Sequence, residues 1–128
     1  DFGEELREAC RRIVSAFMAY PELIGGTDRL DTLIMQKASG KLICKVGADG
    51  LWLCGVLPSP KWKRGLGIAL KIEDGDDFLA RPAVTVEILR QLGVLDKDDL
   101  KEISPLPIKN RRGEFVGRVE AKIDLATK

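Results

Sequence analysis

The chain of 128 residues contains no histidine. Ser-His-Asp and Cys-His catalysis and histidine-ligated metals all need an imidazole, so the composition excludes these chemistries from this segment. The three cysteines, Cys10, Cys44 and Cys54, show no CxxC spacing. Neither a zinc site nor a disulfide framework is therefore indicated. We interpret the cysteines as buried thiols of a cytosolic protein.

The sequence also lacks a long apolar run and an excess of either charge. No stretch approaches the roughly 18 to 20 apolar residues that span a bilayer, and the acidic start has no signal-peptide pattern. With 21 basic and 20 acidic residues, the net charge is +1, which attracts neither nucleic acid nor an anionic membrane. We expect a soluble, cytoplasmic protein with no nucleic-acid and no membrane partner. A start without methionine suggests a fragment or a processed chain.

Residues 41–56 organise the rest of the chain. Two apolar runs flank the short loop Gly47-Ala48-Asp49-Gly50, which predicts a β-hairpin. Lys45 falls within the first apolar run, where a charged side chain is costly unless another group pairs with it or uses it. Lys45 is therefore the first candidate for a functional residue.

The other predicted elements surround this hairpin. An amphipathic helix over residues 4–20, stopped by Pro21, carries an apolar stripe that we expect to pack in the core. A short helix capped by Thr27 or Asp28 precedes the hairpin. A strand over 66–72, a helix from 78 or 82 to 92 and a strand over 115–123 follow it. For that helix we expect carboxylates of the acidic loop 73–77 at the N-terminus and Gly93 at the C-terminal cap, and we expect Pro105 and Pro107 to break regular structure after it. Residues 1–128 are thus predicted to form one α+β domain, or a fragment of one, with helices packed on an antiparallel sheet.

Two features of the order of elements lead to a resemblance. Lys45-Val46-Gly47 at the end of a strand, followed by an antiparallel meander and a closing helix, resembles the C-terminal part of the serine β-lactamase and penicillin-binding-protein fold, whose motif is Lys-Thr-Gly. The runs over 26–32, 45–50 and 65–75 resemble the C-terminal half of the bacterial L-asparaginase II family of the rhizobial thermolabile type. The resemblance covers most of residues 6 to 120.

The resemblance implies a hydrolase that converts L-asparagine to L-aspartate and ammonia with a serine nucleophile activated by a lysine. The family's strand lysine maps onto Lys45, which would orient and deprotonate the serine. Gly47 would let the backbone approach the substrate closely. Thr27 and Arg29 match the family's Gly-Thr-x-Arg run and would support the site wall or bind the substrate carboxylate. No metal ligand is expected in this segment, and the family's zinc would belong to a missing N-terminal half.

This sequence departs from the family pattern at two points. Val46 replaces the usual threonine, which removes a hydroxyl from the motif. No Ser-x-x-Lys motif occurs, so the nucleophile must come from the missing N-terminal half, and we expect this segment alone to be inactive. That half is the expected partner, and a homodimer stays open. The alternatives are a non-catalytic binding or structural module that keeps the fold, and another β-lactamase-like hydrolase.

Overall fold

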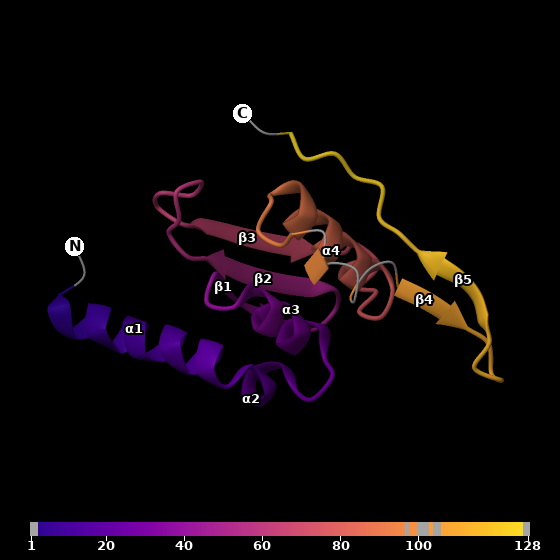
Figure 1. Ribbon diagram of the computed structural model, residues 1–128, viewed down its shortest axis with the longest axis horizontal. Coiled ribbons are helices and arrows are strands. Elements are labelled where there is room, and N and C mark those ends of the chain that lie inside the picture. The colour runs from indigo at the N-terminus through magenta and orange to yellow at the C-terminus, as the bar shows by residue number, and fades with distance from the viewer. Residues whose placement is uncertain (1–2, 97, 100–102, 104–105, 127–128) are drawn as a thin grey trace. The chain divides into compact units, whose positions relative to one another are not determined.

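The computed structural model describes residues 3–96, 98–99, 103 and 106–126 and confirms the α+β class. Figure 1 shows the helices and the two antiparallel sheets. The first sheet has the strand order β1-β2-β3, and the second consists of β4 and β5. In chain order the elements are α1 (Glu4–Ala19), α2 (Pro21–Gly25), α3 (Leu30–Ala38), β1 (Leu42–Val46), β2 (Leu51–Val56), β3 (Leu66–Lys71), α4 (Ala80–Gln91), β4 (Leu106–Lys109) and β5 (Phe115–Val119).

The predicted hairpin is confirmed as β1 and β2. Gly47 N donates a hydrogen bond to Leu51 O at 2.9 Å, which closes the turn between the two strands. Asp49 and Gly50 have φ values of 56° and 74°. Two successive residues with positive φ are typical of the type I′ turn, whose twist matches that of the flanking strands. The Asp-Gly pair therefore explains why the chain reverses at this point.

The described chain divides into two compact units. The first comprises Asp1–Lys45 and Cys54–Gly67, and the second comprises Val46–Leu53 and Ile68–Lys128. Each unit has buried apolar side chains of its own. Ile34 and Leu42 are completely buried in the first unit, and Trp52 and Leu89 are completely buried in the second. Lys45 and Val46, consecutive residues of β1, lie on either side of the division.

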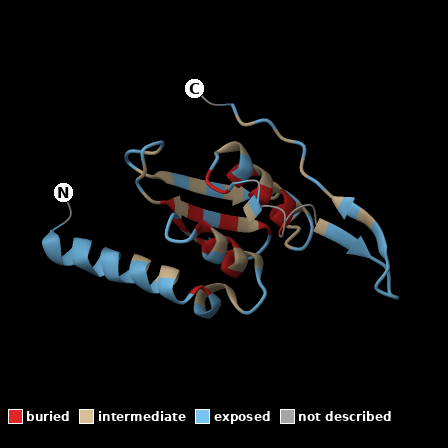
Figure 2. Ribbon diagram, in the orientation of Figure 1, coloured by how far each residue is buried: buried red, intermediate tan, exposed pale blue. Residues whose placement is uncertain are grey.

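Helix α1 confirms the predicted helix but not the predicted burial of its apolar stripe. It contacts α2, yet none of its residues is buried, and Figure 2 shows it exposed along most of its length. Leu6 and Ile13, both on the stripe, are 48% and 56% exposed. The expectation that Cys10 is a buried thiol is also wrong, since this side chain is exposed, whereas Cys44 and Cys54 are buried as expected. Periodicity predicts which residues share a face, but not what covers that face.

The start of helix α3 corrects another prediction. The helix begins at Leu30, and the N-cap residue is Arg29, whose side chain makes no capping hydrogen bond. The expected cap by Thr27 or Asp28 is therefore wrong, because the backbone turns at Asp28, where φ is 56°. The polar residues Asp31 and Thr32, in the first turn of this helix, are buried.

In the second unit, helix α4 confirms the predicted helix and its N-terminal carboxylate. Asp76 accepts hydrogen bonds at 2.8 to 3.0 Å from the backbone N–H groups of the two residues before the helix, Phe78 and Leu79, and of its first residue, Ala80. These bonds satisfy donors that have no partner within a helix, and they lower the pKa of the Asp76 carboxyl below its ordinary value. At the other end, Gly93 has a φ of 63°, as predicted for a glycine just beyond the helix.

The β4–β5 hairpin contains a strand that the sequence did not predict. Strand β5 confirms the first part of the predicted tail strand, and the turn at 110–113 joins it to β4. Pro107 was expected to break regular structure, but it lies in β4 opposite Arg118. A proline lacks only its own N–H group, so it fits a strand that is an edge of its sheet, as both strands are here.

A glutamine on α4 holds the tail of the chain. Gln91 Nε2 donates to Ile123 O at 2.5 Å, and Leu125 N donates to Gln91 Oε1 at 2.9 Å. Gln91 Nε2 also lies 2.7 Å from Glu87 Oε1. Hydrogen bonds from Arg90 and then Gln91 lower the pKa of the Glu87 carboxyl from 4.5 to about 2. The side-chain amide thus replaces a strand partner for residues beyond β5.

Candidate functional site

Lys45 lies on the exposed side of strand β1. Burial alternates along this strand, so that Leu42 and Cys44 point into the first unit while Lys45 is exposed. The argument that its charge is buried in an apolar run is therefore wrong, because successive side chains of a strand point to opposite faces. The Lys45 side chain is exposed, one residue before the end of β1.

Gly47 follows Lys45 at the end of β1, and the structure gives a local reason for a glycine here. A Cβ built on Gly47 would lie 2.7 Å from Leu51 Cδ2, which is too close. The missing side chain therefore makes room for Leu51 as the hairpin closes. Val46, which stands between Lys45 and Gly47 where the resemblance expects threonine, is half-buried.

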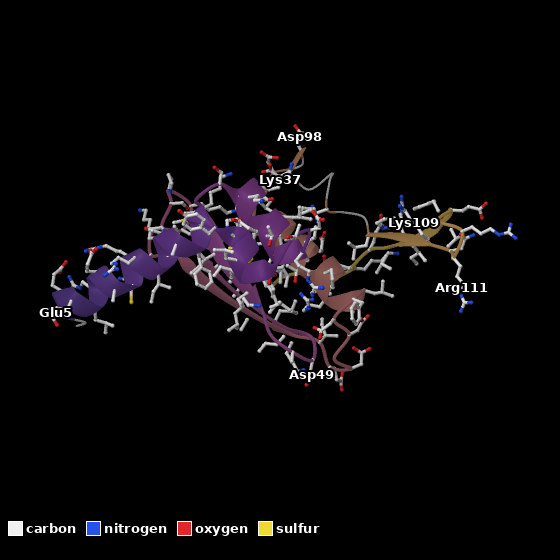
Figure 3. The ribbon with its side chains drawn as sticks, turned by 90° about the horizontal axis from the view of Figure 1, so that it is seen from below. Glu5, Lys37, Asp49, Asp98, Lys109 and Arg111 are labelled. Carbon is white, nitrogen blue, oxygen red and sulfur yellow. The ribbon has the colours of Figure 1, made fainter. Side chains whose placement is uncertain are left out.

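The turn after Gly47 is tied to the segment that follows β3, within the second unit. Gly50 N donates to Asp77 Oδ1 at 2.9 Å, and Ile72 N donates to Gly50 O at 3.0 Å. The Lys71 ammonium donates to Asp49 O. Figure 3 shows Asp49 at the tip of the turn. A carboxylate, a backbone amide and an ammonium therefore hold two consecutive residues of one tight turn.

Asp77 is itself held by a buried arginine. Arg81 Nε donates to Asp77 Oδ1 at 3.0 Å, and Arg81 Nη2 donates to Asp77 O at 2.9 Å. Arg81 is only 4% exposed, so its charge depends on this partner. The hydrogen bond from Gly50 N, followed by the bond and the charge of Arg81, keeps the pKa of the Asp77 carboxyl below its ordinary value. Asp77 therefore accepts these bonds as a carboxylate.

Thr27 and Arg29 lie in the loop between α2 and α3, and both are exposed. The backbone of this loop is held by Thr32, whose buried hydroxyl lies 2.6 Å from Gly26 O and 3.3 Å from Pro21 O. Gly26 has a φ of 94° and a ψ of 162°, a conformation adopted almost only by glycine. The side chains of Thr27 and Arg29 thus project from a loop that is fixed through its backbone.

One buried contact joins helix α3 to strand β1 within the first unit. The Cys44 thiol lies 3.7 Å from Asp31 O. Asp31 follows Arg29 by two residues, and Cys44 directly precedes Lys45. Because Cys44 points to the buried face of β1 and Lys45 to the opposite, exposed face, this contact does not bring the Lys45 side chain toward Arg29. Burial, followed by the negative charge of Asp31, raises the pKa of the nearby Cys54 thiol to about 12. Cys54 is therefore a packed thiol, not a reactive one.

A comparison with models of protein families identifies the family of this chain. The model of the L-asparaginase II family matches residues 2–121. The chain belongs to this family. The match includes the four predicted site residues Lys45, Gly47, Thr27 and Arg29. A comparison with curated proteins found no match.

The described residues of this L-asparaginase II chain were searched for metal-binding clusters and for membrane-spanning helices. Among these residues, no group of three or more cysteine, aspartate or glutamate side chains is placed to hold a metal ion. In the described part of the chain, no helix is long and apolar enough to cross a membrane.

Sequence reasoning missed Asp77 and Arg81. Their spacing of four residues is typical of an ion pair on one helix face, and this signal could have found the pair. The contact between Asp77 and Gly50 joins residues 27 positions apart. No local pattern predicts such a contact, because it depends on the return of β3 beside the hairpin.

Proposed function

We propose that residues 1–128 form the C-terminal portion of an L-asparaginase-like amidohydrolase with a β-lactamase-like fold. The substrate is a small amide, L-asparagine, and the products are L-aspartate and ammonia. The observation that carries this proposal is the family match across Lys45-Val46-Gly47. The serine nucleophile comes from an N-terminal portion of the same cytoplasmic protein, so this segment alone is inactive.

The chemistry assigned to Lys45 is proton transfer. A serine hydroxyl attacks the side-chain amide carbon of asparagine while the Lys45 amine takes the hydroxyl proton. The proton then passes to the leaving nitrogen, and ammonia departs, which leaves an ester between the aspartyl group and the serine. Water hydrolyses this ester and restores the serine. The exposed side chain of Lys45, one residue before the end of β1, supports this assignment.

The loop between α2 and α3 supplies the proposed substrate contacts. The Arg29 guanidinium is exposed, and its planar set of donors suits a carboxylate such as that of asparagine. Thr27, two residues earlier, adds a hydroxyl to the site wall. Gly47 is assigned to the close approach between the substrate and the backbone after Lys45, on the side that Leu51 does not fill.

The uncovered helix α1 supports the idea of a further portion of the protein. Its apolar stripe is amphipathic in pattern, yet Leu6 and Ile13 stay about half exposed. An apolar face of this kind is typical of a surface that packs against another part of a protein. The nucleophile, and the zinc that the resemblance implies, are assigned to that portion.

A comparison of two chains tests the proposal. Ammonia release from L-asparagine and from L-glutamine is measured for residues 1–128 and for a longer chain that adds the N-terminal portion. The proposal predicts no release by the short chain and release from asparagine by the longer one. A longer chain that releases no ammonia from asparagine would refute the proposed activity.

Val46 favours a second candidate, a binding or structural module that keeps the fold without catalysis. The family motif has a threonine at this position, and valine removes its hydroxyl. The substitution Val46→Thr in the longer chain separates the two candidates. An active enzyme gains affinity for asparagine, measured as a lower KM, whereas a non-catalytic module stays inactive with either residue.

A further inference from the structure

The turn that follows Lys45 is held from outside its own hairpin. Within the hairpin, Gly47 N donates to Leu51 O at 2.9 Å and Leu51 N donates to Ala48 O at 3.3 Å. The segment after β3 then adds the bond from Gly50 N to Asp77 Oδ1 and the bond from Ile72 N to Gly50 O. Because Gly50 is held through its N–H and its C=O, the turn cannot tilt without breaking one of them.

The fit around Gly50 is also close. A Cβ built on Gly50 would lie 2.8 Å from Ile72 Cβ and 3.2 Å from Gly75 Cα. Gly50 is buried, although the neighbouring tip residues Ala48 and Asp49 are exposed. The turn is therefore packed against the segment after β3 as well as hydrogen-bonded to it.

The adjacent carboxylates of that segment, Asp76 and Asp77, accept hydrogen bonds from different parts of the chain. Asp76 accepts hydrogen bonds from the backbone N–H groups of Phe78, Leu79 and Ala80, at the start of helix α4 and just before it. Asp77 accepts Gly50 N and Arg81 Nε on the same oxygen. The first carboxylate stabilises a helix end, whereas the second connects that helix to the turn. The pair therefore offers a matched comparison between support of the helix and support of the turn.

We propose that Asp77 is a positioning residue, which fixes the turn after Lys45 through its bond to Gly50 and thereby sets the direction of the Lys45 amine. Arg81 keeps Asp77 in place through its two hydrogen bonds. Only Val46 separates Lys45 from the turn at 47–50, and Gly47 N is itself bonded across the hairpin. The catalytic part of this inference rests on the proposed function, but the effect on the position of Lys45 does not.

The first experiment measures the position of Lys45 without any substrate. Lysines are acetylated to a low extent with a small amine-reactive reagent, and mass spectrometry gives the rate at Lys45 relative to Lys37. We expect Asp77→Ala to change this ratio severalfold, and Asp77→Asn to change it less because an amide oxygen still accepts from Gly50 N. Asp76→Ala should weaken α4 and leave the ratio unchanged. Equal ratios in the wild type and Asp77→Ala would overturn the inference.

The second experiment measures asparagine hydrolysis in the longer chain. Asp77→Ala should lower kcat about tenfold with little change in KM, since a displaced catalytic group slows chemistry more than binding. Asp77→Asn should recover part of this loss. The same fall in kcat for Asp76→Ala and Asp77→Ala, at matched thermal stability, would show that only helix support matters and would overturn the inference. A longer wild-type chain without activity would refute the proposed function, and the acetylation ratio would then decide the positioning role alone.

Discussion

The loop that carries Thr27 and Arg29 and the turn that follows Lys45 are held by different kinds of hydrogen bond. The loop at 26–29 is fixed by a neutral hydroxyl, that of Thr32, on the carbonyl of Gly26. The turn at 47–50 is fixed by a charged group, the Asp77 carboxylate, on the N–H of Gly50. Hydrogen bonds that involve an ionised group are stronger than neutral ones. The comparison indicates that the geometry after Lys45 is more firmly held than the geometry around Arg29.

Alanine substitutions at Gly50 and Gly26 should have the largest effects on the stability of the turn and the loop. Gly50→Ala places a Cβ against Ile72 and Gly75 at a positive φ, and we expect a loss of about 3 kcal/mol in the free energy of unfolding. Gly26→Ala meets only the Arg29 side chain, at 3.1 Å, so backbone strain of about 1–2 kcal/mol remains. Denaturant unfolding measures each change. A larger loss for Gly26→Ala would reverse the comparison.

Substitution of a buried hydroxyl should have the next largest effect. Thr32→Val removes the donor that reaches Gly26 O, with a loss of about 1–2 kcal/mol. Thr85→Val is the matched control, because this hydroxyl is completely buried and has no hydrogen-bond partner among the described residues. The control should be neutral or stabilising. Thermal unfolding of the two variants measures the difference, and equal losses would show that the Thr32 bond adds nothing.

As the pH falls, the turn at 47–50 should lose its support, whereas the loop at 26–29 should keep its support. The folded-state pKa of Asp77 lies below its ordinary value of 3.8, so its contribution to stability is present above 3.8 and is lost as the pH falls through the lower folded value. Protonation weakens the bond from Gly50, whereas the neutral Thr32 hydroxyl does not titrate. NMR amide shifts should therefore titrate at Gly50 and not at Gly26. The same titration of Gly50 in Asp77→Asn would contradict the assignment to Asp77.

Local patterns predicted most of the fold. The Asp49-Gly50 pair reverses the chain with two positive φ values, Pro21 follows the end of α1, and Asp76 accepts the N–H group of Ala80, the first residue of α4. Two elements were missed for opposite reasons. Helix α2 begins at Pro21, which was interpreted only as a stop, and β4 contains Pro107, which was interpreted only as a break. Proline permits both structures when its missing N–H is not needed.

The candidate site was less predictable than the fold. The position of Lys45 at the end of a strand followed from the hairpin pattern, but its exposure did not, because the apolar run 42–44 masked the alternation of faces. The burial of Asp31 depends on contacts that α3 makes after the chain has folded, including that with Cys44. The support of the turn by Asp77 depends on residues distant in sequence. Patterns along the chain therefore located the lysine, and tertiary contacts determine how it is held.

The role of Lys45 is tested most directly by Lys45→Ala in the longer chain, with ammonia release from asparagine as the measurement. Lys41→Ala is the matched control, since Lys41 is also exposed and lies just before β1. Loss of a proton-transferring amine should lower kcat by about 10³-fold, and the control should change it less than about twofold. Wild-type activity in Lys45→Ala would contradict the account.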